Sequence, residues 1–337
     1  MVIVLSERKQ PPANLTAEDW FNLGIALGEQ GKLEEALEAF SVTTELRPRD
    51  AAVWFNKGLV LDQLGRINEA LECYHKATEL DPSYIEGWNN LGAAYKELNR
   101  FEDALHSFTQ ATRIFTANPQ DYADAWYNRG LVLHELGRYQ EALECLIETV
   151  TVNPKDAKGW YYRGSLHEQL AQWDDAIICY KRATKLAPTY LDAWIDLGEL
   201  LGNINRVDEA IKAFDRAIKL DSKNARVWYD KGVALGLIDQ HADAVKAYRK
   251  ATALNPEDEK SLFNLANTLA RNLEEYTPAL EVVDTLLQIN PEHTNGVYLR
   301  GRILIELKRK KEANECFKKV LTLDPNYPYL KEEKGSG

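Results

Sequence analysis

The stretch Trp54-Phe55-Asn56-Lys57-Gly58-Leu59 recurs along the chain and decides its fold. Ala70 follows sixteen residues after Trp54, and Tyr74, Ala77 and Pro82 come after it. The same pattern opens at six other tryptophans: Trp20, Trp88, Trp126, Trp160, Trp194 and Trp228. Successive copies are 34, 34, 38, 34, 34 and 34 residues apart. A nearly fixed period of this length is the signature of stacked repeats.

Two small residues keep their places in every copy. Glycine stands four residues after the tryptophan, at Gly24, Gly58, Gly92, Gly130, Gly164, Gly198 and Gly232. Alanine stands sixteen residues after it, at Ala36, Ala70, Ala104, Ala142, Ala176, Ala210 and Ala244. This pattern resembles the tetratricopeptide repeat (TPR) over nearly the whole chain. The resemblance implies pairs of antiparallel helices that stack on one another.

Two further copies lack the tryptophan. Leu262 and Ala266 open the eighth, and Val297 and Gly301 open the ninth. We therefore predict nine units, at residues 17–50, 51–84, 85–122, 123–156, 157–190, 191–224, 225–258, 259–293 and 294–327. Residues 1–16 are expected to be an extended lead-in and 328–337 a flexible tail. Whether Gly335-Ser336-Gly337 is native stays open.

The expected fold is all-α, a right-handed superhelical α-solenoid of TPR hairpins. Small residues at Gly58 and Ala70 let the two helices of a unit approach closely, and Trp54 fills the space between layers. Proline ends most second helices because it lacks the N–H that would continue the helix. The third unit carries four extra residues, and we predict that its second helix runs on until Pro119 ends it.

The composition argues against several classes of partner. The net charge is −11, whereas a nucleic-acid-binding surface would be basic. Residues 1–122 are the most acidic region, with 11 basic and 19 acidic residues, which favours a neutral or basic partner. No apolar run approaches the roughly eighteen residues of a membrane span, and Val2-Ile3-Val4-Leu5 is too short for a signal peptide. We expect a cytoplasmic protein without direct membrane insertion.

No catalytic, cofactor or metal site is expected. The cysteines Cys73, Cys145, Cys179 and Cys316 all occupy one slot of the second helix, just before a residue that is aromatic in most units, and four other units have Ala39, Ser107, Ala213 and Ala247 there. A small buried packing residue explains this slot better than a metal ligand, because metal ligands must converge. No phosphate-binding loop or nucleophile elbow is present. We therefore predict that the chain is not an enzyme.

The candidate binding residues lie two residues after the tryptophan. This slot points about 200° away from the tryptophan around the first helix, at ~100° per residue. It holds Asn22, Asn56, Asn90 and Asn128, and later Asp196 and Asp230. The asparagine row resembles the ladder in the TPR region of eukaryotic O-linked N-acetylglucosamine transferase, which implies that it holds an extended peptide backbone. No transferase domain accompanies it here, and hydrogen bonding to adjacent helices is the alternative role.

The residues just after the tryptophan are mostly aromatic. Phe21, Phe55, Tyr127 and Tyr161 would either anchor a bound segment or pack between neighbouring first helices. Chaperone-adaptor TPR domains instead clamp a C-terminal carboxylate with lysine and with asparagine just after the glycine. That second slot holds Ile25, Leu59, Ala93, Leu131, Ser165, Glu199 and Val233 here, so we predict no such clamp.

These observations predict a non-catalytic scaffold that binds a protein or peptide segment in a concave groove, in the assembly of a multi-subunit or membrane complex. The alternative is a regulatory or substrate-targeting subunit of a separately encoded enzyme, such as a transferase. The ninth unit has little sequence after it to cover Phe317, Val320 and Leu321. Self-association through this last repeat is therefore also expected.

Overall fold

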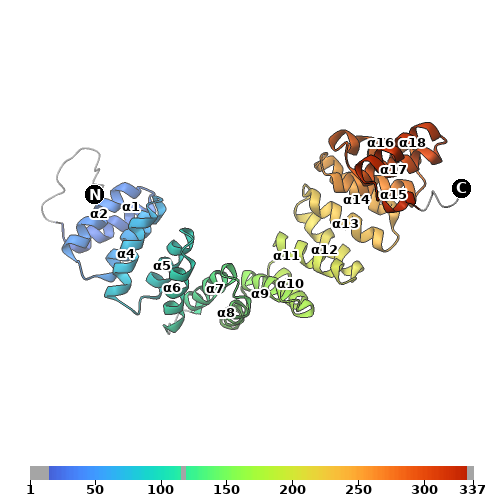
Figure 1. The fold of residues 1–337 in the computed structure, drawn as a ribbon. Helices are drawn as coiled ribbons and strands as arrows, with labels where there is room; N and C mark the ends of the chain where they lie inside the picture. Colours follow the sequence, from blue (N-terminus) through green and yellow to red (C-terminus); the bar gives the residue numbers. More distant parts are fainter. Residues whose placement is uncertain (1–14, 115–118, 332–337) are drawn as a thin grey trace. The chain divides into compact units, whose positions relative to one another are not determined.

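The computed structural model describes residues 15–114 and 119–331. In these ranges the regular structure is helical throughout, without strands (Figure 1). The chain divides into two compact parts, which we call the N-terminal part (residues 1–179) and the C-terminal part (residues 180–337). The boundary falls within one helix, and each part is described by itself.

The N-terminal part consists of helix hairpins in tandem. Its helices are α1 (Ala17–Glu29), α2 (Leu33–Leu46), α3 (Ala51–Gln63), α4 (Ile67–Leu80), α5 (Ile85–Glu97), α6 (Phe101–Arg113), α7 (Pro119–Glu135), α8 (Tyr139–Val152), α9 (Ala157–Gln169) and the start of α10 (Trp173–Leu186). Odd-numbered helices are the first helices of a unit, and even-numbered ones are the second helices.

The C-terminal part continues the same alternation. Its helices are α11 (Leu191–Asn203), α12 (Val207–Leu220), α13 (Ala225–Leu237), α14 (His241–Leu254), α15 (Glu259–Arg271), α16 (Tyr276–Ile289), α17 (Thr294–Glu306), α18 (Lys310–Leu323) and the short α19 (Pro328–Lys331). The predicted all-α solenoid of helix hairpins is thus confirmed.

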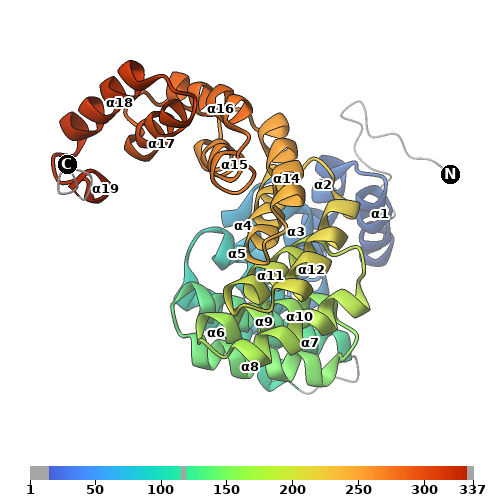
Figure 2. The same cartoon turned by 90° about the vertical axis from the view of Figure 1, so that its right-hand side faces the viewer.

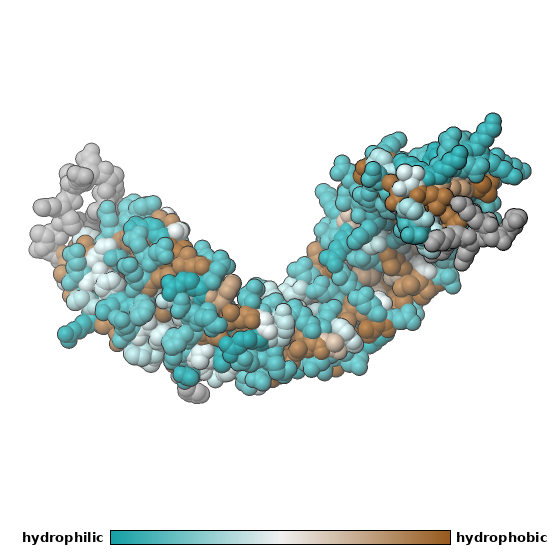
Figure 3. Space-filling model, viewed as in Figure 1, coloured by the Kyte–Doolittle hydropathy of each residue, from teal (hydrophilic) through white to brown (hydrophobic). Residues whose placement is uncertain are grey.

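The repeated small residues do what their positions predict. A Cβ atom added to Gly58 on α3 would lie 2.7 Å from the ring of Tyr74 on α4, so only glycine allows this approach. Ala70 and Tyr74 are fully buried in the same hydrophobic cluster. The core of the N-terminal part is a series of such clusters, whereas one cluster extends from Leu235 to Leu330 in the C-terminal part. Hydrophilic residues lie among hydrophobic ones on the visible surface (Figure 3).

The extra residues of the third unit lie elsewhere than predicted. Second helix α6 ends at Arg113, and Pro119 begins α7, which has 17 residues where other first helices have 13. Pro119 starts a helix because proline is tolerated in the first turn, whose N–H groups have no helical acceptor. The added turn reaches back to the preceding first helix, since Asn89 Nδ2 donates to the Asp121 carbonyl oxygen at 3.4 Å.

The chain after the ninth unit also departs from the prediction of a flexible tail. Pro328–Lys331 form α19, which follows α18 at the end of the C-terminal part (Figure 2). Tyr327 and Leu330 are each 6% exposed and belong to the hydrophobic cluster of this part. Apolar burial at the end of the array holds this segment in place. Residues 332–337 and the lead-in 1–14 lie outside the described residues.

Candidate peptide-binding surfaces

The asparagine row lies on four consecutive first helices of the N-terminal part. Asn22 on α1 is exposed, while Asn56 on α3, Asn90 on α5 and Asn128 on α7 are half-buried. Each follows its tryptophan by two residues, so the same helical face carries all four. The side chains therefore have the exposure that contact with a ligand requires.

Two of these amides are held by their own helix. Asn56 Nδ2 donates to the Ala52 carbonyl oxygen at 2.8 Å, and Asn90 Nδ2 donates to the Glu86 carbonyl oxygen at 3.1 Å. The alternative role, bracing of adjacent helices, would require a bond to another helix, and neither of these bonds reaches one. Each bond uses one of the two Nδ2 hydrogens and neither lone pair of Oδ1. An amide fixed in this way still has a donor and an acceptor for a peptide backbone.

The aromatic residues beside the row pack within the array. Phe55 is 9% exposed, with its ring centroid 5.8 Å from Tyr74 and 4.9 Å from Tyr84, the N-cap residue of α5. Phe21, Tyr127 and Tyr161 are half-buried, and they lie 5.8, 5.6 and 5.1 Å from Phe40, Tyr162 and Tyr162 respectively. These distances are those of edge-to-face aromatic pairs. Phe55 in particular has little surface left for a partner.

The aspartates of this slot belong to the C-terminal part. Asp196 on α11 and Asp230 on α13 are half-buried. Arg226 Nε lies 3.7 Å from Asp230 Oδ2, and its Nη2 lies 2.7 Å from Glu199 Oε1. Burial raises the pKa of Asp230 above its ordinary value, against the opposing charges of Arg226 and Lys260. This surface differs from the asparagine row because it is acidic and because Arg226 of the same chain already pairs with Asp230 and Glu199.

A pocket that the repeat pattern did not predict lies between the first helices of the last two units. A cavity of about 450 Å³ lies between α15 and α17, with Asn267 and Arg302 among its lining residues. Both occupy the slot just after the small residue, the slot that Val233 occupies in the seventh unit. These two units keep the register without the tryptophan, with Ala266 and Gly301 in the small-residue slot. Following that slot through Ala266 and Gly301 would have revealed both residues.

The described ranges show no sign of a metal site or a reactive thiol. No group of three or more histidine, cysteine or acidic residues there could hold a metal ion. Burial raises the pKa of the Cys73, Cys145 and Cys179 thiols to about 11, as expected for packing residues. Among residues 15–114 and 119–331, none of the helices combines the length and apolar character needed to cross a membrane.

Family comparisons agree with the architecture. Models described as tetratricopeptide repeat match residues 17–50, 85–118, 123–156, 157–190 and 195–259, and one described as TPR repeat matches 61–99. A model of subunit 3 of the anaphase-promoting complex, or cyclosome, matches residues 238–320. Together the TPR matches cover more than half of the chain.

Individual relatives are distant. The human protein O-mannosyl-transferase TMTC3 is 36% identical over 67 residues, which are 20% of this chain and 7% of that protein. The chain thus matches less than a tenth of that relative's length, and this match gives no information on the activity of the chain.

Solved structures show the same fold. The C-terminal part of a TPR repeat-containing protein from Cytophaga hutchinsonii has a TM-score of 0.61 and 18% identity, over 72% of this chain and 98% of that one. PilF from Pseudomonas aeruginosa has a TM-score of 0.51 and 18% identity, over 65% and 99%. With repeat matches from residue 17 onward and these neighbours in fold, the chain belongs to the tetratricopeptide repeat family.

Proposed function

We propose that this chain is a protein-interaction scaffold that holds an extended peptide or protein segment along the first helices of its N-terminal part. The segment is neutral or basic, because residues 1–122 carry an excess of acidic side chains. Assembly of a multi-subunit or membrane complex from the cytoplasm is the process in which we place it. The chain itself performs no chemistry.

The observation that carries the proposal is the state of the asparagine row. Asn56 and Asn90 are anchored through Nδ2 to their own helices, at 2.8 and 3.1 Å. Anchoring lowers the rotational freedom that binding would otherwise remove, so each amide is preorganised. An amide presents both a donor and an acceptor, which matches the alternating C=O and N–H groups of an extended backbone.

Because the asparagines bind the backbone amides of the partner, this arrangement tolerates many partner sequences. Phe21 and Tyr127, which remain half-buried, supply side-chain selectivity at the edge of the row. Tyr161 extends the same aromatic slot into the fifth unit. Asp196 and Asp230 offer a second, acidic surface for a basic portion of a longer partner.

The test replaces Asn56 and Asn90 together by alanine. Each lost hydrogen bond weakens binding by about 1 kcal/mol, so the pair weakens it by more than about tenfold. Full-length wild type and variant are used to capture partners from the native host, and the captured proteins are quantified. The wild type is expected to retain a defined partner that the variant loses.

The matched control replaces two exposed asparagines of second helices, Asn68 and Asn314, by alanine. This control should capture the partner as well as the wild type does. A thermal melt separates the two roles of the row. Early melting of the Asn56→Ala/Asn90→Ala variant would show that the asparagines brace the helices, and unchanged capture by a stable variant would place the groove elsewhere. A captured transferase as dominant partner would favour the targeting-subunit alternative.

A further inference from the structure

The pocket between α15 and α17 is built from one face of each helix. On α15 its lining includes Phe263, Asn267 and Ala270, which recur at helical spacing, and on α17 it includes Asn295, Leu299 and Arg302. The cavity of about 450 Å³ lies in the range of roughly 300–1,000 Å³ that is typical of ligand pockets. A pocket of this size admits a large side chain together with part of a backbone.

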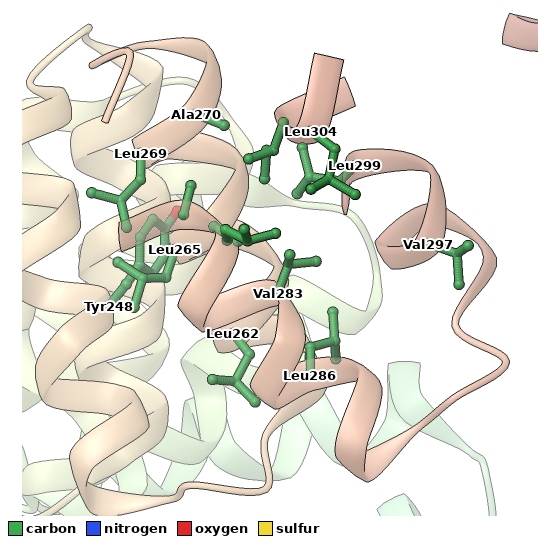
Figure 4. Packing of buried hydrophobic residues seen from close by; sticks show 14 of the residues in the cluster. Tyr248, Leu262, Leu265, Leu269, Ala270, Val283, Leu286, Val297, Leu299 and Leu304 are labelled. Carbon is green, nitrogen blue, oxygen red and sulfur yellow. The ribbon is translucent and has the colours of Figure 1, made fainter. Parts of the chain in front are cut away.

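The floor of the pocket is apolar. Ala270, Leu299 and Ile303 are 7%, 5% and 1% exposed, and they are part of the hydrophobic cluster of the C-terminal part. Figure 4 shows Ala270 on one helix directed toward Leu299 and Leu304 on the other. An apolar group placed on this floor would be removed from water on several sides, which is the main source of affinity in such pockets.

One end of the pocket carries aromatic and amide groups. The Tyr327 hydroxyl donates to Asn295 Oδ1 at 2.8 Å, and the Tyr298 and Tyr327 rings lie 5.1 Å apart. This bond orients the Asn295 amide and leaves its Nδ2 hydrogens as donors. Asn267 lines the same pocket from the opposite helix. Two amides facing one cavity are suited to hold a peptide group.

The charges at the rim cancel. Arg302 stands one helical turn before Glu306 on α17, whereas Arg271 ends α15 and Glu274 lies in the turn after it; all four line the pocket. Such alternation gives no net attraction for an anion or a cation. A charged ligand would be attracted by two of these side chains and repelled by the other two.

We propose that this pocket is a second binding site, independent of the asparagine row, which takes an uncharged stretch of a partner protein with one bulky apolar or aromatic side chain. The side chain rests on the floor at Ala270 and Leu299. Asn267 and Asn295 hold the adjoining peptide group. Anchor pockets of this kind carry a large share of the affinity of protein interfaces.

The test uses para-fluorinated N-acetylphenylalaninamide, a capped and uncharged aromatic residue, as the probe. Fluorine NMR of the probe is recorded while the full chain is titrated in, and binding broadens the signal. Asn267→Trp is expected to fill the pocket and weaken binding by roughly tenfold, as loss of a central anchor does. Gln288→Trp, an exposed position on α16, is the matched control and should bind as the wild type does.

A second variant keeps the test decisive if Asn267→Trp melts early. Asn295→Ala removes the oriented amide but not the apolar floor, so it should weaken the amide probe yet leave binding of para-fluoroethylbenzene unchanged. The proposal would be overturned if the wild type did not broaden the probe signal. It would also be overturned if Asn267→Trp and Asn295→Ala both broadened the signal as much as the wild type does. Tighter binding of the free acid of the probe would overturn the uncharged ligand class. The Asn56→Ala/Asn90→Ala variant should bind the probe normally, so failure of one site does not decide the other.

Discussion

The indole Nε1–H of Trp54 donates a hydrogen bond to the backbone carbonyl oxygen of Pro48, six residues earlier, at 3.0 Å. The same bond, at 3.0 to 3.1 Å, joins Trp88 to Pro82, Trp160 to Pro154, Trp194 to Pro188 and Trp228 to Ser222. The tryptophan therefore ties the turn before its helix to the helix itself. Because the acceptor is a backbone carbonyl, Ser222 serves as well as proline.

Trp126 lacks this bond. Its Nε1 is buried without a hydrogen-bond partner in the described part of the chain. The residue six positions earlier, Gln120, already lies inside α7, which begins at Pro119. Helix formation at this position replaces the turn that offers a carbonyl in the other units. The four extra residues of the third unit thus remove one bond of the series.

The comparison of Trp54→Phe with Trp126→Phe tests this account. Both changes remove similar apolar area, but only the first breaks a hydrogen bond, with a net cost of about 0.5–1.5 kcal/mol. The second removes an unsatisfied buried donor and should be less destabilising by about that difference. Urea unfolding followed by circular dichroism measures both. Equal loss of stability in the two variants would contradict the role given to the Trp54 bond.

Replacing glycine by alanine should have opposite effects on stability at the helix crossing and elsewhere in a helix. Gly58→Ala places a Cβ 2.7 Å from the fully buried Tyr74 ring, an overpacking that costs about 1–3 kcal/mol. Gly28→Ala meets no atom within 4 Å and should instead stabilise α1 by about 0.5–1 kcal/mol. Thermal melts of the two variants should therefore move in opposite directions. A neutral Gly58→Ala would show that the Tyr74 ring can move aside.

The cysteines should be unreactive in the folded chain. Burial raises the pKa of Cys73, Cys145 and Cys179 to about 11, so little thiolate is present in mildly alkaline buffer. We expect slow alkylation of these three by iodoacetamide, and fast alkylation after denaturation, as mass spectrometry of peptides would show. Fast alkylation of any of the three in the folded chain would show that this thiol has a role other than packing.

Asp230 should lower the stability of the fold at neutral pH. Its pKa is raised above 3.8, chiefly because burial disfavours the carboxylate. For a raised carboxyl pKa, the penalty is absent below the unfolded pKa, grows as pH rises from the unfolded to the folded pKa, and is fully present above the folded pKa. Asp230→Asn should therefore raise the melting temperature at neutral pH, with a smaller gain in acid. A lower melting temperature at neutral pH would show that attraction to Arg226 outweighs burial.

The sequence predicted the hairpins because each packing residue has its own slot. Trp54, Gly58 and Ala70 are enough to place two helices and their crossing. The error at the third unit has a simple cause, since proline both ends helices and begins them, and Pro119 does the latter. The burial of Phe55 depends on Tyr84, the N-cap residue of α5, and the helical spacing within α3 does not reveal this contact. The repeat register places Asn267 and Arg302 in one slot, but it does not show that α15 and α17 leave a cavity between them.

Self-association through the ninth unit remains a prediction, and the structure changes how it should be tested. Val320 is fully buried, whereas Phe317 and Leu321 are partly buried. Phe317 packs on Tyr298 with ring centroids 6.0 Å apart, so a polar residue there would disturb the hairpin itself. Tyr327 and Leu330 cover the same cluster from outside the hairpin.

Replacing Tyr327 and Leu330 together by serine should uncover this apolar end and strengthen self-association. Sedimentation velocity over a range of concentrations would then show a larger species for the variant than for the wild type, since exposed apolar area drives association. The control replaces Leu220 and Leu254, each 39% exposed already, by serine and should leave sedimentation unchanged. A Tyr327→Ser/Leu330→Ser variant that stays folded and sediments as a monomer at every concentration would show that the ninth unit does not pair with another chain.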